Sequence, residues 1–505
     1  MSGTLLHQPV AVIGAGIMGA GIAQVAALAG HTVRLFDTRE SAATTARDKL
    51  AATLDTLAAK GKLAPAAAQA AVARIEPVAS IEGCSGVGLV IEAVVENLEV
   101  KRALFRELEA LVAEDAVLAT NTSSISVTAI ANGLKHPGRL VGMHFFNPVS
   151  LMKLVEVVSG LHTAPAVAEA IFELAKAWGK VPVHAKSTPG FIVNRMARPY
   201  YAETLALLLE QAAPPAVLDA CLKAAGFRMG PCELMDLIGH DTNFAVTNSV
   251  YEANFYDKRY VPSLVQREMV EGGLLGRKSG RGFYAYPDGV PTLPVAVFDA
   301  PNTAREVVVH GDGAIADALE GAVTTALAAQ GWGPARERSS AWVGLAIDNA
   351  QLVMTDGRPA FGLAAATGMT DTAVFDRPIV LPTTPGCALA YAVNAGAAEA
   401  WRSQAPAWLN ALGFAPLPMA DAPGLVVART IAMLVNEASD AVLQGVCTAD
   451  GADAAMKLGV NYPAGPFDWL RGWSAEGVIG VLRALDNAYR GERYRVSPYL
   501  SRMPS

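Results

Sequence analysis

Residues 9–37 read P-V-A-V-I-G-A-G-I-M-G-A-G-I-A-Q-V-A-A-L-A-G-H-T-V-R-L-F-D, and this stretch decides the fold. A short β-branched run, 9–13, leads directly into the glycine-rich segment 14–19. Helix-forming residues continue to Ala29, and a second apolar run, 31–36, ends on Asp37. This order of strand, glycine-rich turn, helix, strand and acidic residue is typical of a dinucleotide-binding βαβ unit.

Each glycine of the segment 14–19 has a physical role in this interpretation. Gly14 permits the tight turn, Gly16 lets a pyrophosphate approach the backbone, and Gly19 lets the helix pack closely on the strand. The helix N-terminus adds attraction for phosphate charge. Ile17 and Met18 belong to the same segment, so we count them among the predicted cofactor-binding residues.

Asp37 indicates which dinucleotide is bound. Its carboxylate can accept a hydrogen bond from a ribose 2′-hydroxyl and would repel a 2′-phosphate, so the sequence favours NAD over NADP. Arg39 follows two residues later and would weaken that preference.

Three further apolar runs end in polar side chains: residues 88–94 before Glu96, residues 116–120 before Asn121 and Ser123, and residues 140–146, which contain His144, before Asn147. In an open parallel sheet, ligands bind outside the carboxyl ends of the strands. We therefore expect these side chains to share one crevice with Asp37. Singly, each has an ordinary alternative: Ser123 or Ser124 could cap the helix 127–131, and Asn147 could form a turn with Pro148.

The stretch 139–159, R-L-V-G-M-H-F-F-N-P-V-S-L-M-K-L-V-E-V-V-S, carries a histidine and a glutamate on two strands joined by a short turn. A turn of this kind can hold His144 beside Glu156, which is the minimum requirement for a general base with an orienting carboxylate. The alternative is a buried structural ion pair. The position of His144 in the predicted crevice favours the catalytic interpretation.

Composition excludes several classes of protein. The 505 residues are 52% hydrophobic and 17% charged, which suits a packed α/β protein of about two to four domains. With a net charge of −7 and no cluster of Lys and Arg, binding to nucleic acid or to an anionic membrane is not expected. The five cysteines lack C-x-x-C spacing, so neither a disulfide framework nor a metal site is predicted. Residues 378–398 form the longest uncharged stretch, but prolines interrupt it, so we do not expect it to cross a membrane. We therefore predict a cytoplasmic protein.

From residue 187 onward the pattern becomes helical. Asn194 lies in the first turns of a helix predicted over 191–209, where its amide could donate to a substrate carbonyl. The glycine-rich loop 275–284 closes this region and carries Lys278. Lys60, at the end of an earlier helix, could meet phosphates of a large substrate, although a solvated helix end is the simpler interpretation.

Residues 8–286 resemble the L-3-hydroxyacyl-CoA dehydrogenases. The resemblance rests on G-A-G-I-M-G (14–19), E-A-V-V-E-N-L-E-V-K (92–101), N-T-S-S (121–124), H-F-F-N-P (144–148), K-L-V-E-V (153–157), T-P-G-F-I-V-N-R (188–195) and G-R-K-S-G-R-G-F-Y (276–284). The segments 196–204 and 236–246 are especially similar to the two-repeat enzymes of phenylacetate degradation, which act on 3-hydroxyadipyl-CoA.

The resemblance implies roles for individual residues. His144 would take the proton of the 3-hydroxyl while C3 passes a hydride to NAD, and Glu156 would orient the histidine. Ser123 and Asn194 would bind the substrate oxygens, and Ser123 would also lie beside the cofactor. Asn147 would hold the nicotinamide end of the cofactor. The cofactor site would also be lined by Glu96, Lys101 and Lys278.

Arg228 departs from the family pattern, which has proline before Met-Gly-Pro. An exposed loop arginine is the simple interpretation; the sharper hypothesis is that Arg228 meets a substrate carboxylate.

The C-terminal third repeats the helical part. S-T-P-G-F-I-V-N-R (187–195) corresponds to D-A-P-G-L-V-V-A-R (421–429), and Glu203 corresponds to Glu437. The copy has Ala428 in place of Asn194, so we interpret it as structural. In single-repeat relatives the helical domain forms the dimer interface, and a second copy could supply that surface in cis. A homo-oligomer remains possible.

We therefore predict an α/β protein with five parts: an N-terminal Rossmann-type domain (1–185), an all-helical domain (186–286), a linker (287–302), a degenerate Rossmann-like α/β segment (303–415) and a second copy of the helical domain (416–505). Within 303–415, the runs 342–347 and 378–381 are predicted to be strands. A second nucleotide site there is not expected because the third glycine is replaced by Ala316. The predicted activity is oxidation of an L-3-hydroxyacyl-CoA with NAD. The alternatives are 3-hydroxybutyryl-CoA as the substrate, or a silent NAD-binding or structural protein on this scaffold.

Overall fold

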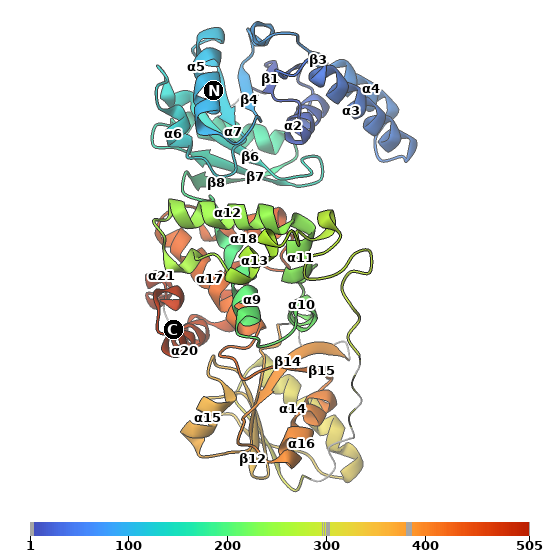
Figure 1. Cartoon of the computed structure of the whole chain (residues 1–505), viewed down its shortest axis with the longest axis vertical. Helices are drawn as coiled ribbons and strands as arrows, with labels where there is room; N and C mark the ends of the chain where they lie inside the picture. The colour runs from blue at the N-terminus through green and yellow to red at the C-terminus, as the bar shows by residue number, and fades with distance from the viewer. Residues whose placement is uncertain (1–4, 295, 297, 299–303, 380–385, 504–505) are drawn as a thin grey trace. The chain divides into compact units, whose positions relative to one another are not determined.

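The computed structural model describes residues 5–294, 296, 298, 304–379 and 386–503 (Figure 1). The chain forms two compact units. The first contains residues 1–195 together with 441–460, and the second contains 196–440 together with 461–505. The segment 441–460 therefore belongs to the predicted second helical repeat by sequence but to the first unit by packing. The predicted linker 287–302 lies partly outside the described residues.

The first unit is built on an eight-stranded sheet of order β3-β2-β1-β4-β5-β6-β7-β8. All neighbouring strands are parallel except β6 and β7, which are antiparallel. The strands are β1 (Val10–Ile13), β2 (Val33–Phe36), β3 (Ile75–Pro77), β4 (Leu89–Glu92), β5 (Val117–Thr120), β6 (Leu140–Phe145), β7 (Leu154–Ser159) and β8 (Val181–Lys186). The helices are α2 (Ile17–Leu28), α3 (Ala42–Ala59), α4 (Pro65–Ala73), α5 (Leu98–Leu111), α6 (Val127–Ala131) and α7 (Pro165–Ala177).

The two faces of this sheet differ. Because side chains alternate along a strand, Met143 and Phe145 of β6 enter the large apolar core beneath α2, α3, α4 and α7. His144 and Glu156 point to the opposite face. They are directly paired in the register of β6 and β7. The catalytic candidates therefore lie together because of strand pairing alone.

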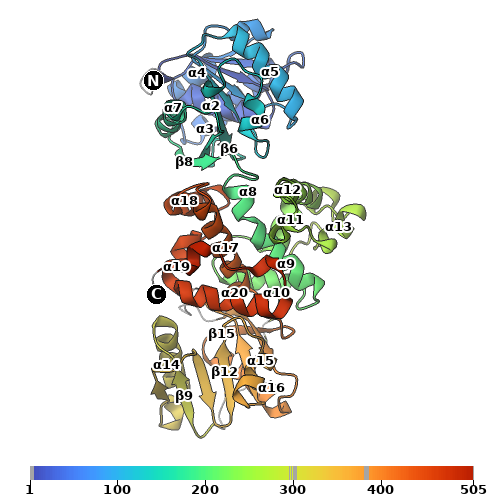
Figure 2. The same cartoon turned by 90° about the vertical axis from the view of Figure 1, so that its left-hand side faces the viewer.

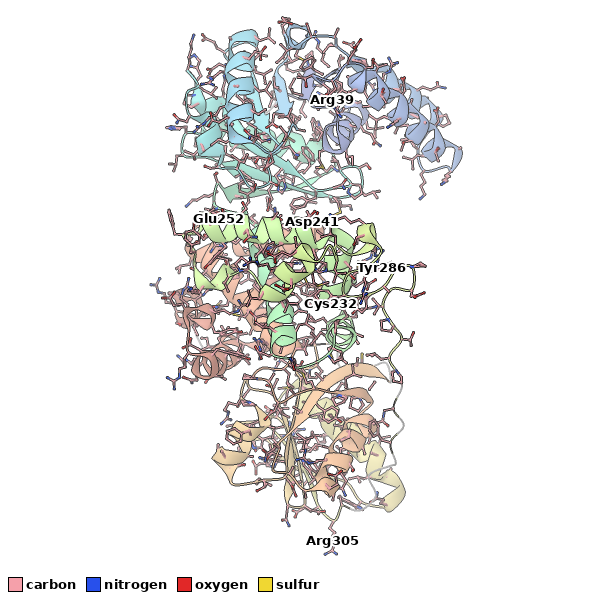
Figure 3. The ribbon with its side chains drawn as sticks, in the orientation of Figure 1. Arg39, Cys232, Asp241, Glu252, Tyr286 and Arg305 are labelled. Atoms are coloured by element: carbon pink, nitrogen blue, oxygen red, sulfur yellow. The ribbon has the colours of Figure 1, made fainter. Side chains whose placement is uncertain are left out.

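The chain enters the helical repeat through α8 (Val193–Met196) and passes into the second unit at residue 196. Repeat 1 continues with α9 (Arg198–Leu209), α10 (Pro215–Ala224), α11 (Pro231–Ile238), α12 (His240–Ala253) and α13 (Leu264–Glu271). The glycine-rich loop that follows is clasped by buried Asp236, which accepts the backbone N–H of Phe283 (2.9 Å) and of Tyr284 (3.0 Å) and the hydroxyl of Tyr286 (3.0 Å), a residue labelled in Figure 3. Burial opposes the ionisation of Asp236, but the hydrogen bond from His240 and these donors hold its pKa below the ordinary value.

The second sheet has seven strands in the order β10-β9-β11-β12-β13-β14-β15. They are β9 (Val307–His310), β10 (Ala335–Glu337), β11 (Gly344–Ile347), β12 (Ala350–Met354), β13 (Thr372–Phe375), β14 (Cys387–Val393) and β15 (Phe414–Pro418). Figure 2 shows this sheet with β9, β12 and β15 labelled. Helices α14 (Ala314–Leu327) and α16 (Glu399–Ala411) share one apolar core on it, while α15 (Ala360–Thr367) packs into a separate one, on the other side of the sheet in Figure 1. The fold class predicted from the sequence is confirmed.

One predicted strand of this region is misplaced. We expected residues 378–381 to be extended in the sheet, but the strand is β13 and ends at Phe375. Pro378 has no N–H for a ladder hydrogen bond, which explains why the strand does not continue. Residues 380 and 381 lie outside the described residues.

Repeat 2 contains α17 (Val427–Leu443), α18 (Ala449–Gly459), α19 (Pro466–Trp473), α20 (Ala475–Tyr489) and α21 (Pro498–Ser501). Among the described residues of the chain, no helix is long and apolar enough to cross a membrane.

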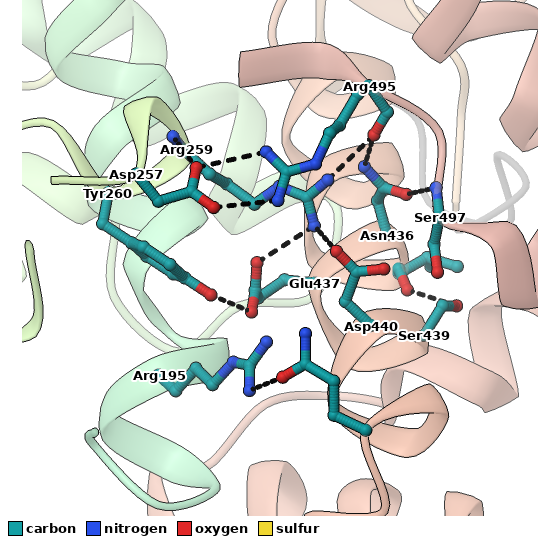
Figure 4. Close-up of polar contacts among 12 residues, drawn as sticks. Arg195, Asp257, Arg259, Tyr260, Asn436, Glu437, Ser439, Asp440, Arg495 and Ser497 are labelled. Carbon is teal, nitrogen blue, oxygen red and sulfur yellow. Dashed lines mark hydrogen bonds and ion pairs between the residues drawn. The ribbon is translucent and has the colours of Figure 1, made fainter. Parts of the chain in front are cut away.

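The two repeats exchange equivalent contacts within the second unit. Glu437 of repeat 2 accepts the hydroxyl of Tyr260 at 2.6 Å and pairs with Arg259 at 3.4 Å (Figure 4). Glu203 of repeat 1, which is the counterpart of Glu437, accepts the hydroxyl of Tyr494 at 3.0 Å and pairs with Arg493 at 2.8 Å. Each buried glutamate is thus held by an Arg-Tyr pair of the other repeat.

Candidate functional site

The glycine-rich loop between β1 and α2 is shaped as a nucleotide turn requires. Gly14 has φ of +105°, and a Cβ there would lie 2.5 Å from the carbonyl oxygen of Ala93. A Cβ on Gly19 would lie 1.8 Å from the carbonyl oxygen of Gly14, so the helix can approach the strand only with glycine there. At Gly16 a Cβ would meet nothing within 4 Å. The space at Gly16 is therefore open to a ligand, and the loop fits a pyrophosphate.

Asp37, one residue beyond β2, is tied to this loop. Its Oδ2 accepts the backbone N–H of Ala15 at 2.8 Å, and its Oδ1 pairs with the Nε of Arg39 at 3.0 Å. The Arg39 hydrogen bond lowers the pKa of Asp37 to about 2 although burial opposes ionisation. Arg39 is itself largely exposed (Figure 3). The carboxylate is ionised at neutral pH, which suits a ribose hydroxyl.

A pocket of about 610 Å³ opens between the loop and the start of α5. It is lined by Gly14, Gly16 and Asp37 together with apolar side chains that the sequence reasoning did not single out: Ile81, Val94, Val100 and Leu104. Apolar walls next to a ribose-binding carboxylate suit the planar base of a dinucleotide. Val94 and Val100 belong to the segment 92–101, whose resemblance to the family could have identified them as lining residues.

Glu96 organises the loop after β5. Its Oε1 accepts the hydroxyl of Thr122 (2.6 Å) and the backbone N–H groups of Ser123 (2.9 Å) and Ser124 (3.1 Å). Burial opposes ionisation, but the bond from Thr122 and the charge of Lys101 hold the pKa of Glu96 below its ordinary value. The two serines therefore face Glu96, and the helix-cap alternative is wrong: Ser126 caps α6 by accepting from the N–H of Ala129.

Lys101 is less accessible than a residue lining a cofactor would be. Its side chain is 1% exposed, and its Nζ lies 2.6 Å from Glu92 and 3.3 Å from Glu96. Glu92, fully buried at the end of β4, also accepts the hydroxyl of Thr120 at 2.7 Å. Sequence reasoning missed Glu92 because it ends an apolar run and carries no separate signal. Lys101 supports the crevice by holding these two carboxylates.

Asn121 joins the ends of β5 and β6. Its side-chain oxygen accepts the backbone N–H of Phe145 at 2.9 Å, next to His144. Asn147 is exposed, two residues beyond the end of β6. The structure thus places Asn121 in the framework of the crevice and leaves Asn147 open at its edge.

His144 and Glu156 form the most constrained pair of the unit. Nδ1 of His144 lies 2.6 Å from Oε2 of Glu156, and the side chains are 7% and 0% exposed. The other carboxylate oxygen of Glu156 accepts the backbone N–H groups of Ile192 (3.1 Å) and Val193 (2.9 Å) at the start of α8. One carboxylate therefore holds the histidine and the entrance to the helical repeat together.

Asn194 follows directly in the same helix. Its Nδ2 donates to the backbone carbonyl of Ser123 at 3.4 Å. The structure thus brings Ser123, His144, Glu156 and Asn194 into one neighbourhood of the first unit.

Three weaker predictions concern exposed residues. Lys60 lies just past the end of α3 in the first unit. Arg228, in the loop between α10 and α11, and Lys278 belong to the second unit. Lys278 contacts Asp241, a residue labelled in Figure 3. The roles of these three residues stay predictions.

Family models match most of the chain. The NAD binding domain of 3-hydroxyacyl-CoA dehydrogenase matches residues 9–188, and its C-terminal domain matches both 190–286 and 424–505. The reduced Rossmann-fold domain of 3-hydroxybutyryl-CoA dehydrogenase matches residues 352–423. The matches to 190–286 and 424–505 agree with the predicted duplication.

Individual relatives cover the chain to different extents. A 3-hydroxyadipyl-CoA dehydrogenase of Escherichia coli K12 is 43% identical over 490 residues, which are 97% of this chain and 95% of the relative. The mitochondrial hydroxyacyl-coenzyme A dehydrogenase of Homo sapiens is 39% identical over 289 residues, 56% of this chain and 92% of the relative. The crystal structure of a 3-hydroxybutyryl-CoA dehydrogenase from E. coli K12 has a TM-score of 0.88 and 42% identity, covering 98% of each chain.

Proposed function

We propose, from the premise that the chain belongs to the 3-hydroxyacyl-CoA dehydrogenase family, that its substrate is 3-hydroxyadipyl-CoA and that the chemistry takes place at His144. The family is established by a relative that is 43% identical over 97% of the chain and by the matching domain models. Its members are NAD-dependent oxidoreductases, so the chain is an enzyme that oxidises a 3-hydroxyacyl-CoA. The residue roles and the acyl chain are what we infer.

His144 is the proposed general base. Because its Nδ1 contacts Glu156, Nε2 is the atom that takes the proton of the 3-hydroxyl. The buried carboxylate stabilises the imidazolium that results. NAD, when bound, accepts the hydride that leaves C3. The contact of 2.6 Å between His144 and Glu156 is the observation that carries this proposal.

Ser123 and Asn194 are the proposed contacts for the substrate oxygens. They reach the same neighbourhood from the end of β5 and the start of the helical repeat, and Asn194 already donates to the Ser123 backbone. An amide and a hydroxyl hold an acyl oxygen without adding charge. We further propose that Glu96 and Asn147 contact the cofactor and that Lys101 acts through Glu96.

The activity is tested by NADH absorbance with the purified full chain and a 3-hydroxyacyl-CoA. His144→Gln should lower kcat by roughly 10²–10⁴-fold, because it removes a general base. Binding of NAD, followed by calorimetry, should be unchanged, since His144 is not part of the Gly14–Gly19 loop. A variant that keeps most of its turnover would overturn the assignment of His144.

The acyl chain is supported by a near-full-length relative named for 3-hydroxyadipyl-CoA, whereas the near-full-length solved structure is named for 3-hydroxybutyryl-CoA. A panel of 3-hydroxybutyryl-, longer-chain and 3-hydroxyadipyl-CoA distinguishes them. We expect the highest kcat/KM with the dicarboxylyl substrate, which would place the enzyme in phenylacetate degradation. Highest kcat/KM with 3-hydroxybutyryl-CoA would favour the alternative.

Arg228 is the proposed contact for the distal carboxylate. It is exposed and therefore available to a ligand. Arg228→Ala should lower kcat/KM for 3-hydroxyadipyl-CoA and leave 3-hydroxybutyryl-CoA unaffected. An equal loss with both substrates would exclude this role.

We also propose that repeat 2 pairs with repeat 1 in cis in place of a partner subunit. The reciprocal Arg-Tyr contacts to Glu203 and Glu437 support this, because an isologous interface repeats each contact in both directions. Activity per chain should then stay constant on dilution to concentrations where native mass spectrometry shows single chains. Loss of activity together with dissociation would contradict cis pairing.

A further inference from the structure

Helix α18 of repeat 2 packs on β7 and β8, the last two strands of the first sheet. It does so as part of the first compact unit, to which residues 441–460 belong. Leu154, Glu156 and Val158 point to one face of β7 because side chains alternate along a strand. Repeat 2 therefore contacts the strand that carries the catalytic carboxylate.

The chain segment before α18 anchors it to the edge of the sheet. The backbone N–H of Lys186, the last residue of β8, donates to the carbonyl of Val446 at 2.9 Å. Nη1 of Arg195 donates to the side-chain oxygen of Gln444 at 2.7 Å. Cys447 lies close enough to Glu156 for that charge, in addition to burial, to raise the pKa of its thiol to about 12.

Gly459, the last residue of α18, lies close against the first sheet. A Cβ at this position would lie 2.7 Å from Cδ2 of Leu154, 2.9 Å from Cγ2 of Val193 and 3.6 Å from Cε1 of Phe146. Distances below 3.0 Å require neighbouring atoms to move. Gly459 has an ordinary backbone conformation, since its φ is not among the positive values. Its lack of a side chain is thus required by packing.

Two of the three neighbours of Gly459 contact the pair of His144 and Glu156, and the third, Leu154, lies beside Glu156 on the same face of β7. The backbone N–H of Val193 donates to Glu156 at 2.9 Å. Leu154 is the next residue on the same face of β7 as Glu156. The ring of Phe146 lies 4.5 Å from the ring of His144, centroid to centroid.

We propose that Gly459 is a positioning residue for the catalytic pair, so that repeat 2 supplies the wall against which His144 and Glu156 are aligned. The proposal rests on the proposed role of this pair. Interiors are packed as densely as crystals, so a side chain at 459 displaces Leu154 and Val193 rather than filling a void. Displacing Val193 moves the N–H that fixes the carboxylate, and the carboxylate fixes the histidine.

The chain offers a matched control. Helix α10 of repeat 1 packs on β14 of the second sheet, and the backbone N–H of Ala420 after β15 donates to the carbonyl of Ala212 at 2.8 Å, as Lys186 does to Val446 in the first sheet. Buried Ala225 follows α10 as the counterpart of Gly459, far in sequence from the catalytic pair. Ala225→Val therefore changes the same kind of contact without touching His144 or Glu156.

The test compares Gly459→Ala, Gly459→Val and Ala225→Val in the full chain. We expect kcat of Gly459→Val to fall roughly 10–100-fold, because displacement of a catalytic group by less than about 1 Å has effects of this size. Gly459→Ala should lose less, and KM for NAD should stay unchanged in both. Ala225→Val should keep wild-type kcat even where its melting temperature falls as much as that of Gly459→Val.

A second readout does not depend on turnover. The Nδ1 proton of His144, in its short contact to Glu156, should give a low-field NMR signal, assigned by its absence from His144→Gln. This signal should shift or broaden in the Gly459 variants, including Gly459→Ala if the valine variant does not fold, and not in Ala225→Val. An unchanged signal and unchanged kcat in folded Gly459→Ala and Gly459→Val, or equal losses in Ala225→Val, would overturn the proposal. If the wild type oxidises no 3-hydroxyacyl-CoA, the proposed substrate fails, whereas the NMR comparison still decides the role of Gly459.

Discussion

The chain enters its two helical repeats in the same way. In the first, Gly190 (φ +75°) and Phe191 (φ +47°) turn the backbone; in the second, Gly424 (φ +74°) and Leu425 (φ +50°) do so. The N–H groups that follow donate to one buried carboxylate in each case. In the first repeat this is Glu156, and in the second it is Asp376, which accepts from Val426, Val427 and Ala428 at 2.9, 2.6 and 3.0 Å.

The two carboxylates differ in what else they hold. Glu156 lies on β7 opposite His144. Asp376 lies one residue beyond β13, within V-F-D-R-P (374–378), which corresponds to H-F-F-N-P (144–148) and has valine in place of the histidine. The helix-capping contact is therefore a property of the shared scaffold. The proposed chemistry needs the additional histidine, and of these two corresponding segments only 144–148 has it.

The largest expected effect separates the two carboxylates. Glu156→Gln keeps the shape and an acceptor for the Val193 N–H but removes the charge that stabilises the imidazolium. We expect kcat to fall roughly 10²–10⁴-fold. Asp376→Asn should leave kcat unchanged in the same NADH assay. Equal losses in both variants would mean that Glu156 is only a cap.

The second largest effect is expected on stability, when the reciprocal contacts between the repeats are changed. Glu203→Gln removes the buried carboxylate that pairs with Arg429 and with Arg493, each at 2.8 Å. The fully buried Arg429 then keeps Glu210, which is partly exposed, at 3.2 Å. We expect a loss of about 3–5 kcal/mol in the free energy of unfolding by urea, because a buried charge that loses its buried partner is costly. Glu437→Gln should lose less, since Arg259 keeps its contact to Asp440. A negligible loss in Glu203→Gln would show that the pairing is not a stabilising interface.

Asp376 should make the stability of the chain depend on pH. Burial raises its pKa from 3.8 to about 6, against the opposing effect of its backbone hydrogen bonds. The unfolded chain releases this proton near the ordinary pKa, so between about pH 4 and 6 the folded state binds more protons. Wild type should therefore lose stability relative to Asp376→Asn as the pH rises through this window, by about 3 kcal/mol. Urea unfolding of both proteins at several pH values measures the difference, and a constant difference would contradict it.

The smallest expected effect concerns Asn194 of the first repeat and its counterpart in the second, Ala428. Asn194→Ala should lower kcat/KM roughly 10-fold, the worth of one hydrogen bond to the substrate. Ala428→Asn restores the amide in repeat 2 and should leave kcat unchanged, because Val374 stands at the position that corresponds to His144. Its stability should fall, since Ala428 is fully buried. A gain in NAD binding beyond one molecule per chain in Ala428→Asn would show a second site.

Sequence reasoning was most informative where structure follows from local order. The glycines 14, 16 and 19, Asp37 and the polar residues after successive strands could be predicted because strand, turn and helix signals are short-range. Glu92 and the burial of Lys101 could not, since a charge buried by pairing has no local pattern. The prediction of a strand over 378–381 was wrong for a different physical reason. Apolar residues next to a proline resemble a strand in composition, but proline has no N–H to donate to the neighbouring strand.

Four features could be read from the order of residues along the chain: the dinucleotide fold, the preference for NAD, the pairing of His144 with Glu156 and the duplication of the helical repeat. Periodicity and motif spacing encode these features along the chain. Three contacts could be found only in the folded chain. Glu156 also caps α8, Asp376 repeats this contact in a segment that has valine in place of the histidine, and Gly459 of repeat 2 packs against Leu154 of β7. Such contacts join residues far apart in sequence, and close packing in three dimensions, rather than local propensity, selects them.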